Sequence, residues 1–298
     1  MLPHESTITD TITAGAGKFM KTYHGPEFRL SARYAFTDNF SVKAGFNSMR
    51  QYIHKLSNTV IMSPTDTWKL SDVNIKPQRG WQAAAGLYLN SPSGIWEYSV
   101  EGYYKRMSDY LDYRGGAKLL MNHHIETDVI NTQGHAYGVE LQVKKQVGKL
   151  NGWMSYTYSR TFLRQNDKRI EKPVNNGDWY PTEYDKPHDF KFVGNYKFTH
   201  RYSMSINVDY STGRPTTIPA GQYYDESTQS MRVYYTERNS YRIPDYFRTD
   251  ISFNIEPSHH LTLLTHSSIS IGVYNVTGRK NAVSYTHLRA HETSAHLV

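Results

Sequence analysis

The sequence contains no cysteine and no long apolar run, and each absence excludes a class of protein. Without cysteine there is no disulfide framework, no Cys-based zinc site, no iron–sulfur cluster and no thiol nucleophile. No segment approaches the roughly 18 apolar residues that a membrane-spanning helix needs. A β-barrel in a membrane is compatible with the mean hydropathy of -0.67, because barrel strands alternate apolar and polar residues.

Motifs of common enzyme and nucleotide chemistry are also missing. There is no P-loop, no Gly-rich dinucleotide fingerprint and no G-x-S-x-G nucleophile motif. The 34 Lys and Arg residues outnumber the 27 Asp and Glu, which gives a formal charge of +7, but the basic residues are dispersed. No basic stripe indicates nucleic-acid binding. We therefore expect no enzyme, no cofactor and no nucleic-acid partner.

Aromatic residues, by contrast, are abundant, and many of them lie in segments where apolar and polar residues alternate with a period of two. They make up 14% of the chain, and tyrosine alone accounts for 25 residues. Met204, Ile206, Val208 and Tyr210 alternate with Ser, Asn and Asp, which predicts a strand with one apolar and one polar face. The same pattern predicts about ten strands, at 27–36, 40–52, 80–89, 96–110, 134–147, 152–163, 187–198, 202–212, 245–256 and 266–277.

The lengths of the strands and of their connections favour a membrane barrel over a soluble sandwich. Many strands reach the roughly 9–11 residues of a tilted membrane strand, whereas soluble strands average about 5–6. The connections alternate between short turns and long loops, as in outer-membrane barrels with their short periplasmic turns. Short turns are predicted at 37–39, 90–95, 148–151, 199–201 and 257–265, and long loops at 53–79, 111–133, 164–186 and 213–244.

Aromatic residues are placed toward both ends of the predicted strands. Two aromatic residues border each of the turns 37–39 and 199–201, and Tyr104 and Tyr158 lie toward the opposite strand ends. This placement predicts an aromatic girdle at each membrane interface, although tyrosine is also simply a good strand former. Arg160 interrupts the apolar face after Tyr158, where we expect the strand to leave the hydrocarbon. The other face carries charges of both signs, which is typical of a hydrogen-bonded barrel interior.

Few residues suggest site chemistry. His123-His124, near Glu126 and Asp128, and the pair His259-His260 are weak metal candidates, since adjacent side chains of an extended chain point apart. We predict no metal site, no catalytic residue and no cofactor-binding residue, and we leave substrate-binding residues open.

Other candidates allow two interpretations. Tyr184–Asp189 contains an Asp–His pair, for which we favour a structural role at a loop–strand junction over acid–base chemistry. Glu101 and Glu140 are only an arbitrary choice of carboxylate pair. Aromatic residues of the long loops could hold a ligand or pack loop against loop; they are Trp68, Trp179, Tyr180, Tyr223 and Tyr224.

The two ends of the chain differ from its middle. Residues 283–298, which begin V-S-Y-T-H-L-R-A-H-E-T and end H-L-V, resemble a translated sequencing-library adapter. We interpret them as a non-native, adapter-derived tail. Residues 1–26 show no signal-peptide pattern, and we interpret them as the remnant of a preceding barrel strand or loop. The native barrel portion is expected to be 27–282.

Several short motifs along 27–282 carry a family resemblance. Asn74–Gln78 resembles a sequence that precedes a barrel strand, and Tyr34–Val42 resembles a barrel hairpin. The more specific motifs are Gly138–Leu141, Gly152–Arg160, Tyr184–Asp189, Tyr210–Pro215, Arg238–Tyr246 and Tyr274–Asn281. In this order they resemble the C-terminal half of the β-barrel of TonB-dependent outer-membrane receptors, in the bacterial branch without a dedicated glycan-binding lipoprotein partner.

The resemblance implies fold, location and function together. The expected fold is all-β, a partial antiparallel transmembrane β-barrel with about ten of the roughly 22 strands of a complete receptor. It implies the outer membrane of a Gram-negative bacterium, contact with outer-membrane lipid, and import of a scarce, unidentified ligand with energy from the TonB complex. The family's plug, TonB box and closing strand are expected outside this sequence.

Two other interpretations remain open at this point. One is a smaller outer-membrane barrel that serves as an adhesin, a protease or a structural anchor. The other is a soluble all-β carbohydrate-active protein, since soluble sandwiches also alternate apolar and polar residues.

Overall fold

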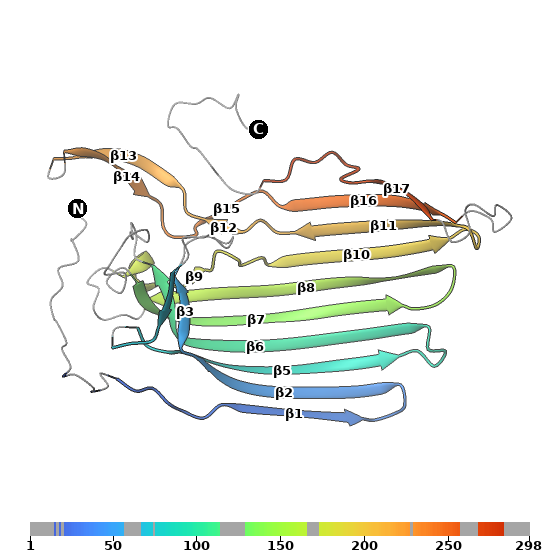
Figure 1. The fold of residues 1–298 in the computed structure, drawn as a ribbon, viewed down its shortest axis with the longest axis horizontal. Helices are drawn as coiled ribbons and strands as arrows, with labels where there is room; N and C mark the ends of the chain where they lie inside the picture. The colour runs from blue at the N-terminus through green and yellow to red at the C-terminus, as the bar shows by residue number, and fades with distance from the viewer. Residues whose placement is uncertain are drawn as a thin grey trace.

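A single large antiparallel sheet dominates the computed structural model of the protein (Figure 1). The structure describes residues 15, 18, 21–56, 67–73, 75–113, 129–165, 173–226, 229–256 and 268–282. The strands of the sheet are β1 (Phe28–Ala35), β2 (Phe40–Gln51), β5 (Gln78–Asn90), β6 (Trp96–Tyr113), β7 (Val129–Lys145), β8 (Leu150–Gln165), β9 (Tyr180–Pro181), β10 (His188–Lys197), β11 (Tyr202–Ser211), β16 (Tyr246–Ile255) and β17 (Ile269–Val273).

The strands follow one another across the 11-stranded sheet in chain order. The order is β1-β2-β5-β6-β7-β8-β10-β11-β16-β17, and the short β9 pairs with β8. Each strand is antiparallel to its neighbours, so the connections alternate between the two ends of the sheet. This meander is the topology that up-and-down barrels use.

The long connections leave the sheet at one end and the short turns at the other (Figure 1, left and right). We call the long-loop end the rim. Small elements form there: β3 (Ile53–Leu56) with β4 (Thr67–Leu70), β12 (Pro215–Thr216) with β15 (Tyr241–Arg242), β13 (Pro219–Asp225) with β14 (Ser230–Tyr235), and the 3-10 helix η2 (Val174–Gly177). No helix within the described ranges is long and apolar enough to cross a membrane.

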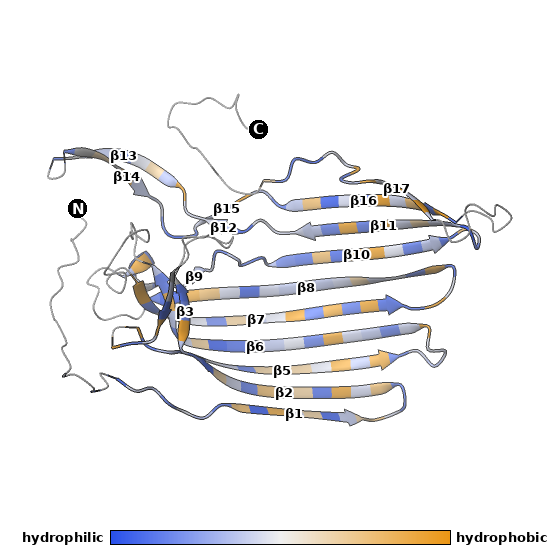
Figure 2. Cartoon of the chain, viewed as in Figure 1, coloured by the Kyte–Doolittle hydropathy of each residue, from blue (hydrophilic) through white to orange (hydrophobic). Residues whose placement is uncertain are grey.

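The register gives the sheet two chemically different faces. Leu87, Val100, Leu141, Tyr156 and Phe190 are successive cross-strand partners from β5 to β10, so they share one face. This outward face is apolar, and Leu87, Val100 and Leu141 are all at least 40% exposed. The alternation of apolar and polar residues along each strand is visible in Figure 2. An apolar face of this extent needs lipid or another apolar layer to cover it.

The opposite, polar face carries the predicted charges. Glu101 of β6 is the cross-strand partner of Glu140 of β7, and Tyr88 donates a hydrogen bond to Glu101 at 2.6 Å. Lys191 is opposite Asp209 in the β10–β11 pair. Charges of both signs occur on this face, as the sequence predicts for a hydrogen-bonded barrel interior.

Aromatic side chains cluster at the short-turn end of the outward face. Phe36 packs on Tyr34 with ring centroids 4.8 Å apart and stacks on Phe40 at 5.5 Å. Phe198 packs on Tyr196 at 4.9 Å, next to another short turn. Nearer the rim, aromatic rings of neighbouring strands meet again, with Trp81 lying 5.5 Å from Tyr104. The two groups occupy the positions of the two predicted girdles.

Fully buried residues gather near the rim instead of beneath the sheet. Ile75 and Val129 form a small apolar cluster against which Leu111 and Tyr113 pack. This core forms because loop residues fold over the ends of the long strands β6 and β7.

A bulge lies on β6 just below this core. Met107 pairs with Gly134 and Tyr110 pairs with Thr132, so β6 has one residue more than β7 at this point. Asp109, inside the bulge, has a φ of 56°, which is uncommon for a residue other than glycine. The extra residue places Tyr110 on the same polar side as Met107.

All the predicted main strands are present. Two predictions of extent need correction: β6 and β7 continue to Tyr113 and back to Val129, because loop residues pair beyond the bulge. The last strand ends at Val273, before a turn in which Asn275 has a φ of 52°. The small hairpins of the long loops were not predicted. Residues 283–298 and nearly all of 1–20 lie outside the described residues.

A pair of neighbouring substitutions tests which face meets lipid. Leu141→Arg places a charge on the apolar outward face and should destabilise the folded barrel by about 1–3 kcal/mol, between the costs of an arginine at the bilayer interface and at its midplane. Gln142→Arg, on the polar face, should change stability little. The free energy of unfolding by denaturant in liposomes measures both. Equal costs would contradict the assignment of faces.

Candidate functional site

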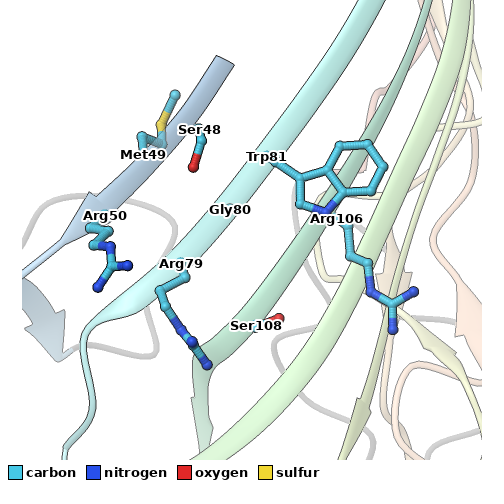
Figure 3. Close-up of a pocket in the computed structure, with 8 residues that line it drawn as sticks. All are labelled: Ser48, Met49, Arg50, Arg79, Gly80, Trp81, Arg106 and Ser108. Atoms are coloured by element: carbon cyan, nitrogen blue, oxygen red, sulfur yellow. The ribbon is translucent and has the colours of Figure 1, made fainter. Parts of the chain in front are cut away.

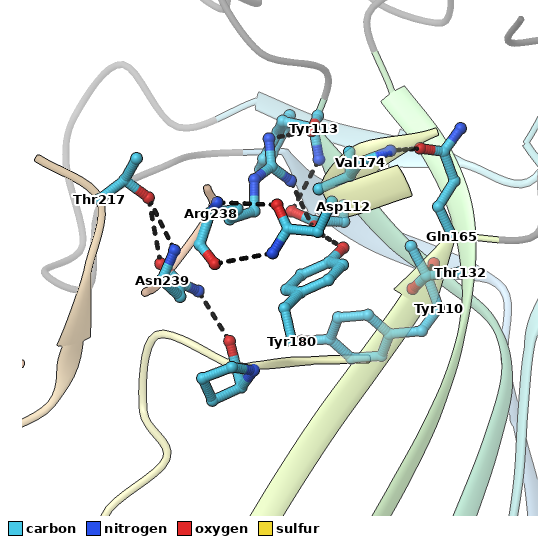
Figure 4. A network of polar contacts seen from close by, with 12 residues as sticks. Tyr110, Asp112, Tyr113, Thr132, Gln165, Val174, Tyr180, Thr217, Arg238 and Asn239 are labelled. Carbon is cyan, nitrogen blue, oxygen red and sulfur yellow. Dashed lines mark hydrogen bonds and ion pairs between the residues drawn. The ribbon is translucent and has the colours of Figure 1, made fainter. Parts of the chain in front are cut away.

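The rim brings together residues that are far apart in the sequence, and one cluster centres on Asp112 at the end of β6. Asp112 accepts hydrogen bonds from the Tyr180 hydroxyl at 2.5 Å and from Arg238 Nη1 at 2.7 Å (Figure 4). Arg238 Nη2 also donates to the Tyr113 carbonyl at 2.6 Å. Tyr180 is only 1% exposed, and burial, together with the Asp112 carboxylate, raises the pKa of its phenol. Tyr180 therefore stays protonated and donates.

Asparagine side chains extend this Asp112 cluster to two loops. Asn175 accepts a hydrogen bond from the Arg238 backbone N–H at 2.8 Å and donates to the Arg238 carbonyl at 3.1 Å. Asn239 donates to the Pro181 carbonyl at 2.8 Å. Asn175 and Asn239 both have positive φ, a conformation that asparagine tolerates better than most residues. The long loop after β11 is thereby held against the loop after β8.

A second cluster surrounds Asp185, whose side chain is fully buried. Its carboxylate accepts a hydrogen bond from the Thr161 backbone N–H at 2.8 Å and lies 3.3 Å from Arg160 Nε. Arg242 forms an ion pair with the same carboxylate and also donates to the Gly213 carbonyl at 2.9 Å. A buried carboxylate needs such compensation, and two guanidinium groups with a backbone donor supply it. This geometry supports a structural role for the Tyr184–Asp189 segment.

A third contact group joins the start of β16 to the end of β11 and to the segment after β17. Asp245 accepts hydrogen bonds from the Tyr210 hydroxyl at 2.8 Å and from the Gly213 backbone N–H at 2.9 Å. Asn281 exchanges two hydrogen bonds of 3.0 Å with the backbone of Phe247. A Cβ on Gly213 would lie 1.7 Å from the Ile243 carbonyl oxygen, so only glycine fits there. The motifs Tyr184–Asp189, Tyr210–Pro215, Arg238–Tyr246 and Tyr274–Asn281 thus converge at the rim.

The loop aromatic residues divide between the two interpretations that the sequence left open. Tyr180 is buried and packs between loops, and Trp179 contacts His135 edge to face with ring centroids 4.3 Å apart. Trp68, Tyr223 and Tyr224 are exposed on hairpins of the rim. Three further exposed residues of the same hairpin were not predicted from the sequence: Met231, Tyr234 and Tyr235. Because four of its exposed residues are tyrosines, Tyr223 and Tyr224 included, we call β13–β14 the aromatic hairpin.

The remaining candidates are the histidine pairs, with their nearby acidic residues, and the pair of glutamates. His123-His124, Glu126, Asp128 and His259-His260 lie outside the described residues. Among the described ranges, no three His, Asp or Glu side chains are grouped so that they could hold a metal ion. Glu101 and Glu140 are neighbours on the polar face, where Glu101 accepts the hydrogen bond from Tyr88.

A meander of long antiparallel strands with an apolar outward face, short turns at one end and looped hairpins at the other defines the wall of an outer-membrane β-barrel. The sequence matches the family described as "TonB dependent receptor-like, beta-barrel" over residues 4–276. The chain belongs to this family, which comprises receptors and transporters of the bacterial outer membrane and not enzymes. The match favours a receptor barrel over the smaller barrel and the soluble carbohydrate-active protein.

Solved structures show the same fold. The FrpB iron transporter of Neisseria meningitidis gives a TM-score of 0.53 at 13% identity, over 85% of this chain and 35% of that chain. The ferripyoverdine receptor of Pseudomonas aeruginosa gives 0.52 at 12%, over 84% and 29%. The ferric-catecholate import receptor Fiu of Escherichia coli gives 0.51 at 14%, over 84% and 30%. The chain therefore spans about a third of these receptors. No curated protein sequence matches it.

The Asp112–Arg238 ion pair is expected to hold the aromatic hairpin's loop to the wall. Arg238→Ala leaves Asp112 and Tyr180 without their cation and should destabilise the loop by about 1–3 kcal/mol, as for other hydrogen-bonded charges. Limited proteolysis of folded barrel should then cut within 213–244 faster.

A double-mutant cycle supplies the control for this pair. Asp112→Ala with Arg238→Ala should cost less than the sum of the two single changes, because the residues are directly coupled. If the two single changes add strictly in free energy, so that their effects on the cleavage rate simply multiply, the proposed anchor would be contradicted.

The β3–β4 hairpin should be sensitive to pH through His54. This side chain is 3% exposed, its Nε2 is 3.0 Å from Ser71 Oγ, and burial lowers its pKa. The folded hairpin disfavours the protonated imidazole, so its stability is intact above the ordinary histidine pKa of about 6.5 and falls as pH decreases below that value.

Hydrogen exchange measures this effect. Protection factors in β3–β4, corrected for intrinsic exchange, should fall between pH 7.5 and pH 5.5, and His54→Gln should remove the dependence. A pH-independent wild-type hairpin would show that His54 does not titrate against its folding.

Proposed function

We propose that the chain forms part of the wall of an outer-membrane receptor that captures a scarce ligand at its rim and imports it with energy delivered by TonB. Membership of the TonB-dependent receptor family carries this proposal. The arrangement of the wall supports it, because the polar face offers charged groups of both signs to a plug domain inside a closed barrel. The rim offers hairpins anchored by partly buried ion pairs.

The aromatic hairpin β13–β14 is the surface that we assign to ligand capture. Tyr224, Tyr234 and Tyr235 are each more than half exposed. Exposed rings on a hairpin present a large contact area at low conformational cost, and their hydroxyl groups add hydrogen bonds. The anchor at Arg238 holds the base of this loop, so a bound ligand would meet a positioned surface instead of a free chain.

Ferric chelates are the first ligands to test. The three solved structures are described as an iron transporter, a ferripyoverdine receptor and a ferric-catecholate import receptor. Phenol rings and arginines at the rim suit flat, anionic or aromatic chelates, through stacking and cation–π contacts.

Iron-limited growth and uptake test the proposal. The receptor that carries this chain, expressed in a host without its own ferric-chelate receptors, should restore uptake of labelled ferric catecholate or ferric hydroxamate. Deletion of the host's TonB should abolish that uptake. Tyr224→Ala and Tyr234→Ala should each weaken ligand affinity about two- to tenfold, the range expected for one aromatic contact.

Tyr202→Ala is the matched control, because this tyrosine is also about half exposed but borders a short turn at the other end of the sheet. Uptake that persists without TonB would contradict coupled import. Equal effects of the Tyr202 and Tyr224 changes would contradict the role of the hairpin.

A further inference from the structure

The outward face of the sheet becomes basic near the rim. Ser48, Trp81 and Arg106 are cross-strand partners on β2, β5 and β6. One step closer to the rim, Arg50 of β2 is opposite Arg79 of β5. Three adjacent strands therefore present three arginines on the outward face.

These arginines line a shallow pocket of about 220 Å³ (Figure 3). Figure 3 shows the side chains of Arg50, Arg79 and Arg106 extending from the three strands, with Trp81 beside Arg106. The hydroxyl-bearing residues Ser48 and Ser108 complete the polar lining. A neighbouring pocket of about 310 Å³ shares Arg50 and Arg79 and is also lined by Lys21 and Lys76.

Positive charge in this pocket exceeds the negative charge available to it. Asp109 is the one acidic residue that lines the two pockets, and it accepts two hydrogen bonds from Arg79 at 2.7 and 3.2 Å. Arg50 donates to the His24 carbonyl at 2.9 Å, and Glu27 binds only the Arg50 backbone N–H. In the described part of the chain, neither Arg50 nor Arg106 has a carboxylate within ion-pair distance. The pocket is complementary to an anion.

The height of the pocket on the sheet identifies the kind of anion. Arg50 lies ten residues beyond Phe40 along β2, and Arg79 lies ten residues from Leu89 along β5. Strands rise about 3.3 Å per residue, and barrel strands tilt by about 40°, so ten residues rise about 25 Å. That distance matches the apolar band of an outer-membrane barrel. With Phe40 and Leu89 at the periplasmic interface, the arginines lie at the outer interface.

We propose that this pocket binds the phosphate group of an outer-leaflet lipid. Guanidinium groups bind phosphate oxygens through paired, charge-assisted hydrogen bonds, and the serine hydroxyls add donors. Trp81 lies just below, where interfacial tryptophans meet the start of the acyl chains. The pocket opens on the lipid-facing side, whereas an imported solute meets the rim and the polar face. The inference rests on the outer-membrane location and is independent of the import proposal.

Native mass spectrometry of the folded receptor that carries this chain, released from detergent micelles, tests the proposal. The probes are diphosphoryl lipid A, its dephosphorylated form and inorganic phosphate. The wild type should retain diphosphoryl lipid A in preference to the other two. Arg50→Gln and Arg106→Gln should each weaken retention about tenfold, as expected for the loss of one charge-assisted contact. Arg106→Lys should retain part of the binding.

Arg201→Gln is the matched control, since it removes an exposed arginine from a short turn at the opposite end of the sheet. Heat-modifiable gel migration verifies that each variant is folded. Equal retention of phosphorylated and dephosphorylated lipid, or unchanged retention in folded Arg50 and Arg106 variants, would overturn the proposal. Binding of inorganic phosphate without lipid retention would overturn the assignment to a lipid.

Discussion

Cross-strand register is the constraint on which the rest of this structure depends. Along the strands, one face must suit lipid and the other must suit water or a plug, and the described residues form no conventional core beneath the sheet that could correct an error. A slip of one residue would turn every Leu and Phe of a strand inward and every Lys and Glu outward. Continuous pairing from β1 to β17 also satisfies the backbone groups, which hydrocarbon cannot do.

At the rim the constraint is different, because loops must be fixed without a large apolar core. Carboxylates take over that role: the buried Asp185 and the partly buried Asp112 and Asp245 each receive donors from separate segments of the chain. Such ionic anchors contribute little net stability, since desolvation opposes them, but they are specific about which groups meet. That property suits a receptor whose hairpins must be held in place while their exposed tyrosines remain available.

The sequence predicts the wall well and the rim poorly, for a physical reason. The strand pattern is local, because the alternation of apolar and polar residues from Met204 to Tyr210 shows which side chains share a face without any information on distant residues. The contacts of the rim are not local, since Arg238 and Asp112 are separated by 126 residues. The motifs around Asp185 and Asp245 could be recognised as a set, but nothing in their composition indicates that they touch one another. The arginine pocket was missed because Arg50, Arg79 and Arg106 align only once the register is known.

The bulge at Asp109 has a consequence for how such walls diversify. Before the bulge the odd-numbered residues of β6, such as Met107, lie on the polar side of the sheet. After the bulge the even-numbered residues Tyr110 and Asp112 lie on that side. Between the bulge and the short turn, the alternation of β6 matches the apolar and polar sides that the bilayer requires. Between the bulge and the rim, it matches the contacts of the Asp112 cluster. A single inserted residue therefore connects two environments, and different loops can be joined to the same barrel without changing which of its residues face lipid.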